Sequence, residues 1–169
     1  DAPQPGSGKG LLAKLVFRIA TGTHAEMEIF PRDNDEMRKK ISTILVSSRP
    51  VVCFDNVESI IYHEALAGVL TADRWSDRLL GTNKRINIPN RAVWIATGNN
   101  IQLGGDIPRR CYLIRINPNS GRPEDRNDFR FNNLEHTVLH ARMPIILQLL
   151  RWAKAWVLAG KPAGALRLG

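Results

Sequence analysis

The chain has 169 residues, enough for one globular domain with a sizeable core, and its 43% content of hydrophobic residues excludes a disordered segment. No apolar run approaches the roughly 18 residues that a membrane-spanning helix needs, so we expect no membrane association. The formal net charge of +8 favours a polyanionic partner such as nucleic acid, although many basic domains bind none. Cys53 and Cys111 lie in apolar runs, and we expect them to be free core thiols in a reducing cytoplasm.

Hydrophobic periodicity and turn residues predict helices and strands in alternation. In chain order we expect a helix at 8–20, a short strand at 25–30, a helix at 33–47, a buried strand at 51–54, a helix at 59–70, a loop or hairpin at 73–91, buried strands at 92–97 and 111–116, and one or two helices within 133–158. This order predicts an α/β fold with helices flanking a parallel sheet. We assign 1–130 to the core, 131–160 to a C-terminal helical segment of the same domain and 161–169 to a tail.

A glycine-rich loop, PQPGSGKG at 3–10, opens the chain. Glycines let backbone N–H groups turn toward phosphate oxygens, the following helix points the positive end of its dipole at the same place, and Lys9 would reach the β- and γ-phosphates. The expected nucleotide-binding residues are Pro5, Gly6, Ser7, Gly8, Lys9, Gly10 and Leu11. Pro3 and Gly10 replace the first glycine and the Mg²⁺-binding serine or threonine of the usual loop. An ordinary turn that starts a helix is the alternative.

Such a loop normally follows a buried parallel strand that is central to its sheet. Here the loop begins at Asp1, so we expect that the first strand of the fold is truncated in this chain.

Asp55 ends the apolar run VVCF, which is typical of a buried parallel strand. In phosphate-loop ATPases an acid at this strand end holds Mg²⁺, here through water. The next residue is Asn56, which cannot act as a base toward the attacking water, and Glu58 is a candidate for that role. A helix-capping role is the alternative for Asp55.

Two further polar features follow the strand predicted at 92–97. The run ATGNN carries Asn99 and Asn100, of which we favour Asn99 as a functional side chain, and a simple Gly-Asn turn is the alternative. The run GDIPRR then brings Arg109 and Arg110 side by side. Guanidinium groups suit phosphate charge, but a surface basic pair or a salt bridge to Asp106 is the alternative.

The basic stretch before the ATGNN strand contains candidates for DNA contact. Arg78, Lys84 and Arg85 could bind phosphates, and Trp75 could stack on a base, although a tryptophan at such a position is more often a core residue. His136 and His140 lie four apart on a predicted helix, but without a third ligand nearby we expect a surface pair rather than a metal site.

Taken together, these segments resemble one family. The runs DAPQPGSGKGLL, VVCFDN, LTADRWSDRLLG, IPNRAVWIATGNN, GDIPRR and RPEDR are similar to the helicase-like ATPase domain of primase-helicase proteins from phages, plasmids and other mobile elements. They also resemble superfamily 3 helicases, a branch of the AAA+ P-loop ATPases. The resemblance covers roughly residues 1–130.

The resemblance implies ATP and Mg²⁺ as cofactors and hydrolysis coupled to DNA unwinding or translocation by a homo-oligomeric ring. It implies that Asn99 is the sensor 1 residue that orients the attacking water. It implies that Arg109 or Arg110 is an arginine finger toward the neighbouring subunit. The hairpin that carries Lys84 and Arg85 would then grip nucleic acid, with single-stranded DNA as the expected form.

Three other functions stay open at this point. Gly10 and Asn56 favour a degenerate nucleotide-binding assembly platform without turnover. The run GSGKG also occurs in small-molecule kinases, although the basic stretch and ATGNN disfavour that reading. A DNA-binding α/β domain that takes no nucleotide is the third.

Overall fold

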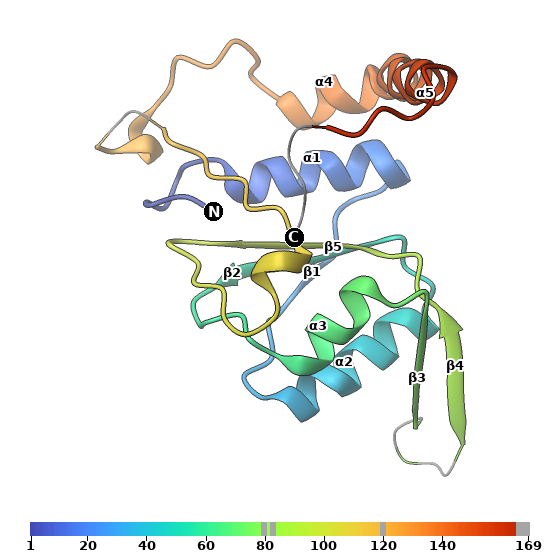
Figure 1. Cartoon of the computed structure of the whole chain (residues 1–169). Coiled ribbons are helices and arrows are strands. Elements are labelled where there is room, and N and C mark those ends of the chain that lie inside the picture. Colours follow the sequence, from blue (N-terminus) through green and yellow to red (C-terminus); the bar gives the residue numbers. More distant parts are fainter. Residues whose placement is uncertain (79–80, 82–83, 119–120, 165–169) are drawn as a thin grey trace.

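The structure, a computed structural model, describes residues 1–78, 81, 84–118 and 121–164. Its elements are α1 (Lys9–Thr21), β1 (Met27–Glu28), α2 (Asn34–Val46), β2 (Val51–Val57), α3 (Glu64–Thr71), β3 (Arg74–Arg78), β4 (Arg85–Pro89), β5 (Val93–Gly98), α4 (Leu134–His140) and α5 (Arg142–Leu158), with 3₁₀ turns at Pro108–Arg110 and Pro123–Asp125. Figure 1 shows α1 on one face of the sheet, with α4 and α5 beyond it, and α2 and α3 on the other face. The predicted α/β architecture of a parallel sheet flanked by helices is confirmed.

β2 is the central strand of the three-stranded sheet, and both β1 and β5 run parallel to it. Cys53 lies opposite Met27 on one side and Ile95 on the other. The first four residues of β2 are buried because helices cover both faces of the sheet, which is why this strand reads as a continuous apolar run. β5 is less well covered than expected, since Val93 at its start is 57% exposed.

The main core lies between the sheet and α2 with α3. In α2 the buried residues Met37, Ile41, Ile44 and Leu45 recur at helical spacing, which turns one apolar face toward β2. Asp33 caps the start of α2 by accepting a hydrogen bond from the Glu36 backbone N–H at 2.9 Å. α3 starts at Glu64, five residues later than the predicted helix at 59–70.

The segment predicted as a loop or hairpin at 73–91 is a two-stranded antiparallel hairpin that projects away from the sheet (Figure 1). Trp75 packs against the core and donates its indole N–H to the Ser42 hydroxyl at 2.9 Å. This placement favours the core interpretation of Trp75 over base stacking. Thr82 and Asn83, which precede Lys84 in the basic stretch, lie outside the described residues.

The prediction of a buried strand at 111–116 is wrong. The segment is extended but belongs to neither sheet, and Tyr112 is 74% exposed. Within the described residues, its backbone hydrogen bonds to other strands or segments run to Asp1 alone, so no full strand covers its apolar side chains. Cys111 is accordingly only half-buried rather than a core residue, whereas Cys53 is fully buried, and both thiols are free.

The C-terminal segment forms two helices, one of the two arrangements expected within 133–158. Neither α4 nor α5 has a buried residue. They are held against α1 by an ion pair between Arg18 and Glu135 at 3.1 Å and by a hydrogen bond from Arg142 to the Ile19 carbonyl at 2.9 Å. Among the described residues, no helix has the length and apolar character needed to cross a membrane. Of the predicted tail at 161–169, only 161–164 are described.

Candidate nucleotide-binding site

The glycine-rich loop leads into α1 through two glycines with left-handed backbone. Gly6 has φ of 70° and Gly8, the N-cap residue of α1, has φ of 83°, a region that side-chain-bearing residues rarely adopt. A Cβ atom on Gly6 would lie 2.8 Å from the backbone nitrogen of Glu124, so the loop also lies too close to the 3₁₀ turn there for any other residue. The loop is therefore a tight turn that leads directly into the N-terminus of α1, the end of a helix that attracts phosphate.

Lys9, the first residue of α1, bridges the loop and the end of β5. Its ammonium donates to the Gln4 carbonyl at 2.9 Å and to the Asn99 side-chain oxygen at 2.7 Å. Partial burial lowers the pKa of Lys9 from its ordinary value, and the nearby Asp55 carboxylate opposes that shift. Lys9 and Asn99, 90 positions apart in the chain, are thus brought into direct contact. Both acceptors of Lys9 are groups that a phosphate oxygen could replace.

Asp55 lies within β2, beside the start of α1. One of its carboxylate oxygens accepts a hydrogen bond from the Thr97 hydroxyl of β5, which orients the carboxylate. A Cβ atom on Gly10 would lie 3.6 Å from the same oxygen and 3.9 Å from the other, an ordinary contact distance. The Asp55 carboxylate therefore faces the first turn of α1 at Gly10, which has no side chain to contact it.

Asn56 and Glu58 continue this edge of the site. The Asn56 backbone is left-handed, with φ of 53°, and its N–H donates to the Thr97 hydroxyl at 3.2 Å. Its side-chain amide donates to the Glu58 carboxylate at 3.1 Å. Glu58, the candidate base, is thus exposed and tied to Asn56 rather than to any other described residue of the site.

The structure separates the two asparagines that the sequence leaves open. Asn99 points to Lys9, whereas the side-chain amide of Asn100 lies 3.4 Å from the Pro3 carbonyl and its oxygen accepts from Arg115 at 3.1 Å. Asn100 also has a left-handed backbone, with φ of 50°. Asn100 therefore shapes the turn, and Asn99 is the residue available to a bound phosphate.

Arg109 and Arg110 differ in their exposure and in the number of contacts they make within the chain. Both form ion pairs with Asp106, as the alternative interpretation expects. The Arg110 side chain is only 18% exposed and also donates to the Ala67 carbonyl at 2.9 Å and to the Thr71 hydroxyl. The Arg109 side chain is 57% exposed, so it is the one that a neighbouring molecule could reach.

The expected DNA contacts lie on the hairpin, apart from the loop of Lys9. Arg78 and Arg85 are exposed and directly opposite each other at the far end of the β3–β4 ladder, next to the exposed Lys84. The hairpin is held to α2 by Arg38, whose bidentate hydrogen bonds keep the pKa of Asp77 below its usual range. Arg78, Lys84 and Arg85 therefore lie on a hairpin that is anchored to α2.

The residues present fit a Mg²⁺ ion bound largely through water. The Asp55 carboxylate lies beside the start of α1, and no cluster of three metal-binding side chains exists within the described ranges. Mg²⁺ bound with a nucleotide commonly takes one or two carboxylates and completes its shell with water and phosphate oxygens. His136 and His140 are both exposed, and their rings lie 4.0 Å apart at an interplanar angle of 43°.

Sequence reasoning missed two residues of the site. Thr97 lies inside the ATGNN run and orients Asp55, but a hydroxyl at a strand end carries no distinct sequence pattern. Glu124 lies in the Pro- and Gly-rich connection and approaches Gly6, a contact across the fold that no local pattern predicts.

Comparison of the chain with models of known protein families, with curated proteins and with solved structures finds no match.

Proposed function

We propose that this chain is the ATP-binding and ATP-hydrolysing domain of a DNA helicase or replication protein, with a P-loop fold of the AAA+ type. Hydrolysis would be coupled to DNA unwinding or translocation in a ring of identical subunits. The sequence resemblance suggests this class, and the geometry of the site supports it.

One observation carries the proposal: the Lys9 ammonium donates to the Asn99 side-chain oxygen at 2.7 Å, and the charge of the Asp55 carboxylate acts to raise the pKa of Lys9. These side chains come from the loop, from the end of β5 and from β2, and they meet at the carboxyl edge of a parallel sheet. That edge is where α/β proteins bind their ligands. A cation, a carboxylate and an amide around a helix N-terminus suit a nucleotide triphosphate.

Each residue has a distinct role in the proposed reaction. Lys9 would bind the β- and γ-phosphates and offset the charge that develops as the terminal phosphate leaves. Asn99 would hold the attacking water by hydrogen bonds. Asp55 would hold water molecules of a Mg²⁺ ion, which when bound neutralises phosphate charge, and Thr97 keeps that carboxylate oriented.

The nucleic-acid part of the proposal rests on charge. The chain has a net charge of +8, and Arg78, Lys84 and Arg85 gather at one end of the projecting hairpin. Arg109 is exposed enough to reach the nucleotide of a neighbouring subunit, where a guanidinium would stabilise the transferred phosphate. A ring that places hairpins around a channel would use both features.

Titration with a fluorescent ATP analogue tests nucleotide binding directly. Lys9→Ala should weaken binding at least about tenfold, the value of one charge-assisted hydrogen bond to phosphate. Lys14→Ala is the matched control, because Lys14 is an exposed lysine of the same helix and should leave binding unchanged. Equal binding by both variants, or no binding by the wild type at millimolar ATP, would contradict the proposal.

A degenerate nucleotide-binding platform is the second candidate. Gly10 offers no hydroxyl beside Asp55, and Asn56 stands where a catalytic acid would activate water. This candidate predicts binding without turnover. Hydrolysis that is lost in Asp55→Ala would exclude it.

A further inference from the structure

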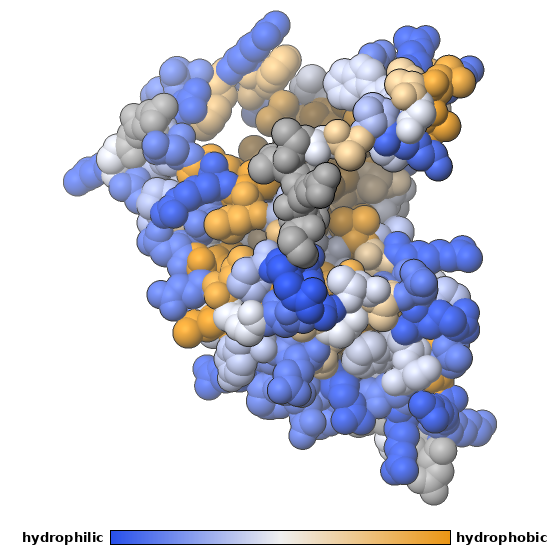
Figure 2. Space-filling view, in the orientation of Figure 1, coloured by the Kyte–Doolittle hydropathy of each residue, from blue (hydrophilic) through white to orange (hydrophobic). Residues whose placement is uncertain are grey.

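α5 is a largely apolar helix that the rest of the described chain leaves uncovered. It lies beyond α1 at the edge of the molecule, and Figure 2 shows hydrophobic residues exposed where Figure 1 draws it. Arg142 anchors its start by donating to the Ile19 and Ala20 carbonyls near the end of α1. Beyond that anchor, every residue from 147 to 158 is exposed. The large apolar side chains that are about half exposed or more include Leu149, Leu150, Trp152, Trp156 and Val157.

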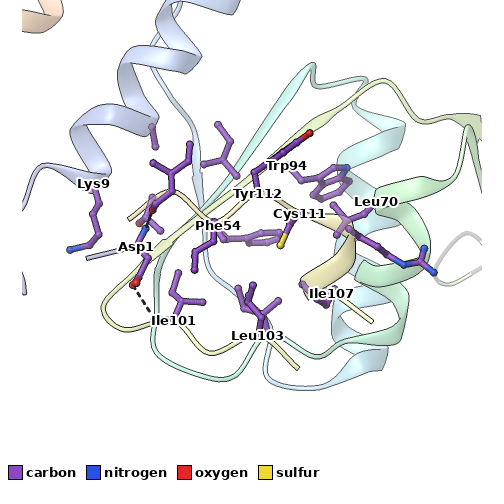
Figure 3. A pocket seen from close by; sticks show the side chains of 18 of the residues that line it. Asp1, Lys9, Phe54, Leu70, Trp94, Ile101, Leu103, Ile107, Cys111 and Tyr112 are labelled. Atoms are coloured by element: carbon purple, nitrogen blue, oxygen red, sulfur yellow. Dashed lines mark hydrogen bonds between the residues drawn. The ribbon is translucent and has the colours of Figure 1, made fainter. Parts of the chain in front are cut away.

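A second apolar surface, a pocket of about 490 Å³, lies between α1 and the loop of Ile101 and Leu103 (Figure 3). Asp1, Lys9 and Thr97 also line it, so the pocket adjoins the candidate nucleotide-binding site. Its walls come from several elements of one chain, and α5 contributes none of the lining residues. The exposed surface of α5 is therefore separate from both the pocket and the nucleotide-binding site.

The apolar residues of α5 have the spacing of a helix that packs along another helix. Two rows run side by side, each with intervals of four, three and four residues, which is the spacing of a heptad seam. The first row is Ile145, Leu149, Trp152 and Trp156. The second row is Ile146, Leu150, Ala153 and Val157. Together the rows form an apolar stripe along the length of the helix.

The polar groups of α5 do not interrupt this stripe. At about 100° per residue, Arg151 lies opposite the two rows and Lys154 lies beside Arg151. The helix contains no acidic residue, so its charged side chains are all cations. The Trp156 indole N–H already donates to the Pro162 carbonyl at 3.0 Å, so burial of this ring would leave that donor paired. The stripe can therefore be buried without an unpaired charge.

The exposed area of the stripe matches what a stable dimer buries. With half or more of each large side chain exposed, the stripe presents roughly 700 Å² of accessible surface per copy. Two copies would bury roughly 1,400 Å², within the range of about 1,200–2,000 Å² for stable protein interfaces. Exposed apolar patches above a few hundred Å² on a monomer mark interaction sites.

The first row is complementary to itself when two copies run antiparallel. If the two-fold axis passes midway between Leu149 and Trp152, Trp152 meets Leu149 of the second copy. In the same register Trp156 meets Ile145 of the second copy. Each large ring then packs against an aliphatic side chain, whereas a parallel pair would set each tryptophan against its own copy. An antiparallel pair also keeps the two Lys154 side chains apart, on opposite sides of the axis.

We propose that α5 is a homodimerisation helix, which packs antiparallel against α5 of a second copy of this chain through the stripe. This inference goes beyond the proposed function and does not require nucleotide. Arg110, next to Arg109, donates to the Ala67 carbonyl of α3, and α3 lies on the opposite face of the sheet from α5 (Figure 1). A contact of Arg109 with a neighbouring subunit would therefore use a different surface.

Two matched substitutions test the interface. Leu149 and Leu147 are 48% and 49% exposed and lie two positions apart, but only Leu149 belongs to the stripe. Sedimentation velocity of the wild-type chain should give a species of twice 18.9 kDa at micromolar concentrations. Leu149→Glu should raise the dimer dissociation constant at least about a hundredfold, because it buries unpaired charges, and Leu147→Glu by less than about threefold. Both variants should keep the helical circular dichroism of the wild type, because neither leucine is buried.

A monomeric wild type at about 100 µM, roughly a hundredfold above micromolar affinity, would overturn the proposal. Equal weakening by the two substitutions, or a dimer unchanged by Leu149→Glu, would do so as well. A monomeric wild type that instead binds phosphatidylserine vesicles through Leu149 would replace the second copy with a lipid surface.

Spin labels test the antiparallel orientation. Arg151→Cys and Leu158→Cys, in a Cys111→Ser background with Cys53 buried, place labels seven residues apart on the same side of α5. The distance between the two copies' labels should be longer at 158 than at 151, since each residue away from the axis adds about 1.5 Å of rise in each helix. Equal distances would indicate parallel helices and overturn the proposed pairing. ATP is absent from these experiments, so their outcomes are independent of nucleotide binding.

Discussion

Two substitutions of Gly10, to alanine and to serine, separate an effect on helix stability from an effect on metal binding. A Cβ atom there would lie 3.6 Å from the nearer Asp55 carboxylate oxygen, so a small side chain fits without displacing its neighbours. Gly10→Ala should stabilise the chain by up to about 1 kcal/mol through helix propensity, and Gly10→Ser by about half of that. For a chain of this length the alanine change corresponds to a Tm increase of roughly 2–4 °C.

The two variants should differ in Mg²⁺-dependent ATP binding. The serine hydroxyl would lie beside Asp55 and could complete the metal shell, so Gly10→Ser should tighten Mg²⁺–ATP binding roughly tenfold, whereas Gly10→Ala should not. Calorimetric titrations with and without Mg²⁺ measure this difference. Equal affinities of the serine and alanine variants, or a loss of stability in both, would refute the placement of Gly10 before Asp55.

Three further predictions concern other parts of the fold. Arg110→Ala should lower the free energy of unfolding in urea by roughly 1–3 kcal/mol, because its hydrogen bonds are largely buried, and more than Arg109→Ala does; equal losses would contradict this. Burial raises the pKa of the Cys53 thiol from 9.0 to about 11. As pH rises from 9 to about 11 the thiol of the unfolded chain loses its proton before that of the folded chain, so the free energy of unfolding should fall. Cys53→Ala should lack this part of the pH dependence, and the same pH slope in the wild type and the variant would contradict the prediction. Trp75→Phe should cost about 1 kcal/mol by removing the bond to Ser42 and leave single-stranded DNA affinity unchanged; weaker DNA binding would instead support stacking.

Much of the fold could be predicted because its patterns are local. Continuous apolar runs marked β2 and β5, and helical periodicity with Asp33 as cap marked α2. The order of loop, acid strand and asparagine strand also predicted that Lys9, Asp55 and Asn99 belong together. In parallel sheets the carboxyl ends of neighbouring strands share one edge, and this rule converts order along the chain into proximity.

The parts that could not be predicted depend on contacts across the fold. The run CYLIRI has the composition of a buried strand, but a strand is buried only if a neighbour covers it. Among the described residues, Asp1 alone pairs with the backbone of this segment. The close approach of Glu124 to Gly6 likewise joins distant segments, as does the bond of Thr97 to Asp55. Composition indicates that Tyr112 is able to be buried, and tertiary structure decides whether it is.

ATP turnover with and without single-stranded DNA tests the central claim most directly. The proposal predicts measurable phosphate release that single-stranded DNA increases. It also predicts that Lys9→Ala abolishes this release and that Asn99→Ala lowers its maximal rate more than it weakens ATP binding. The control Asn100→Ala should retain far more activity, because that side chain shapes the turn and does not contact Lys9. Absence of turnover at every DNA concentration in the wild-type protein, despite ATP binding, would contradict the claim.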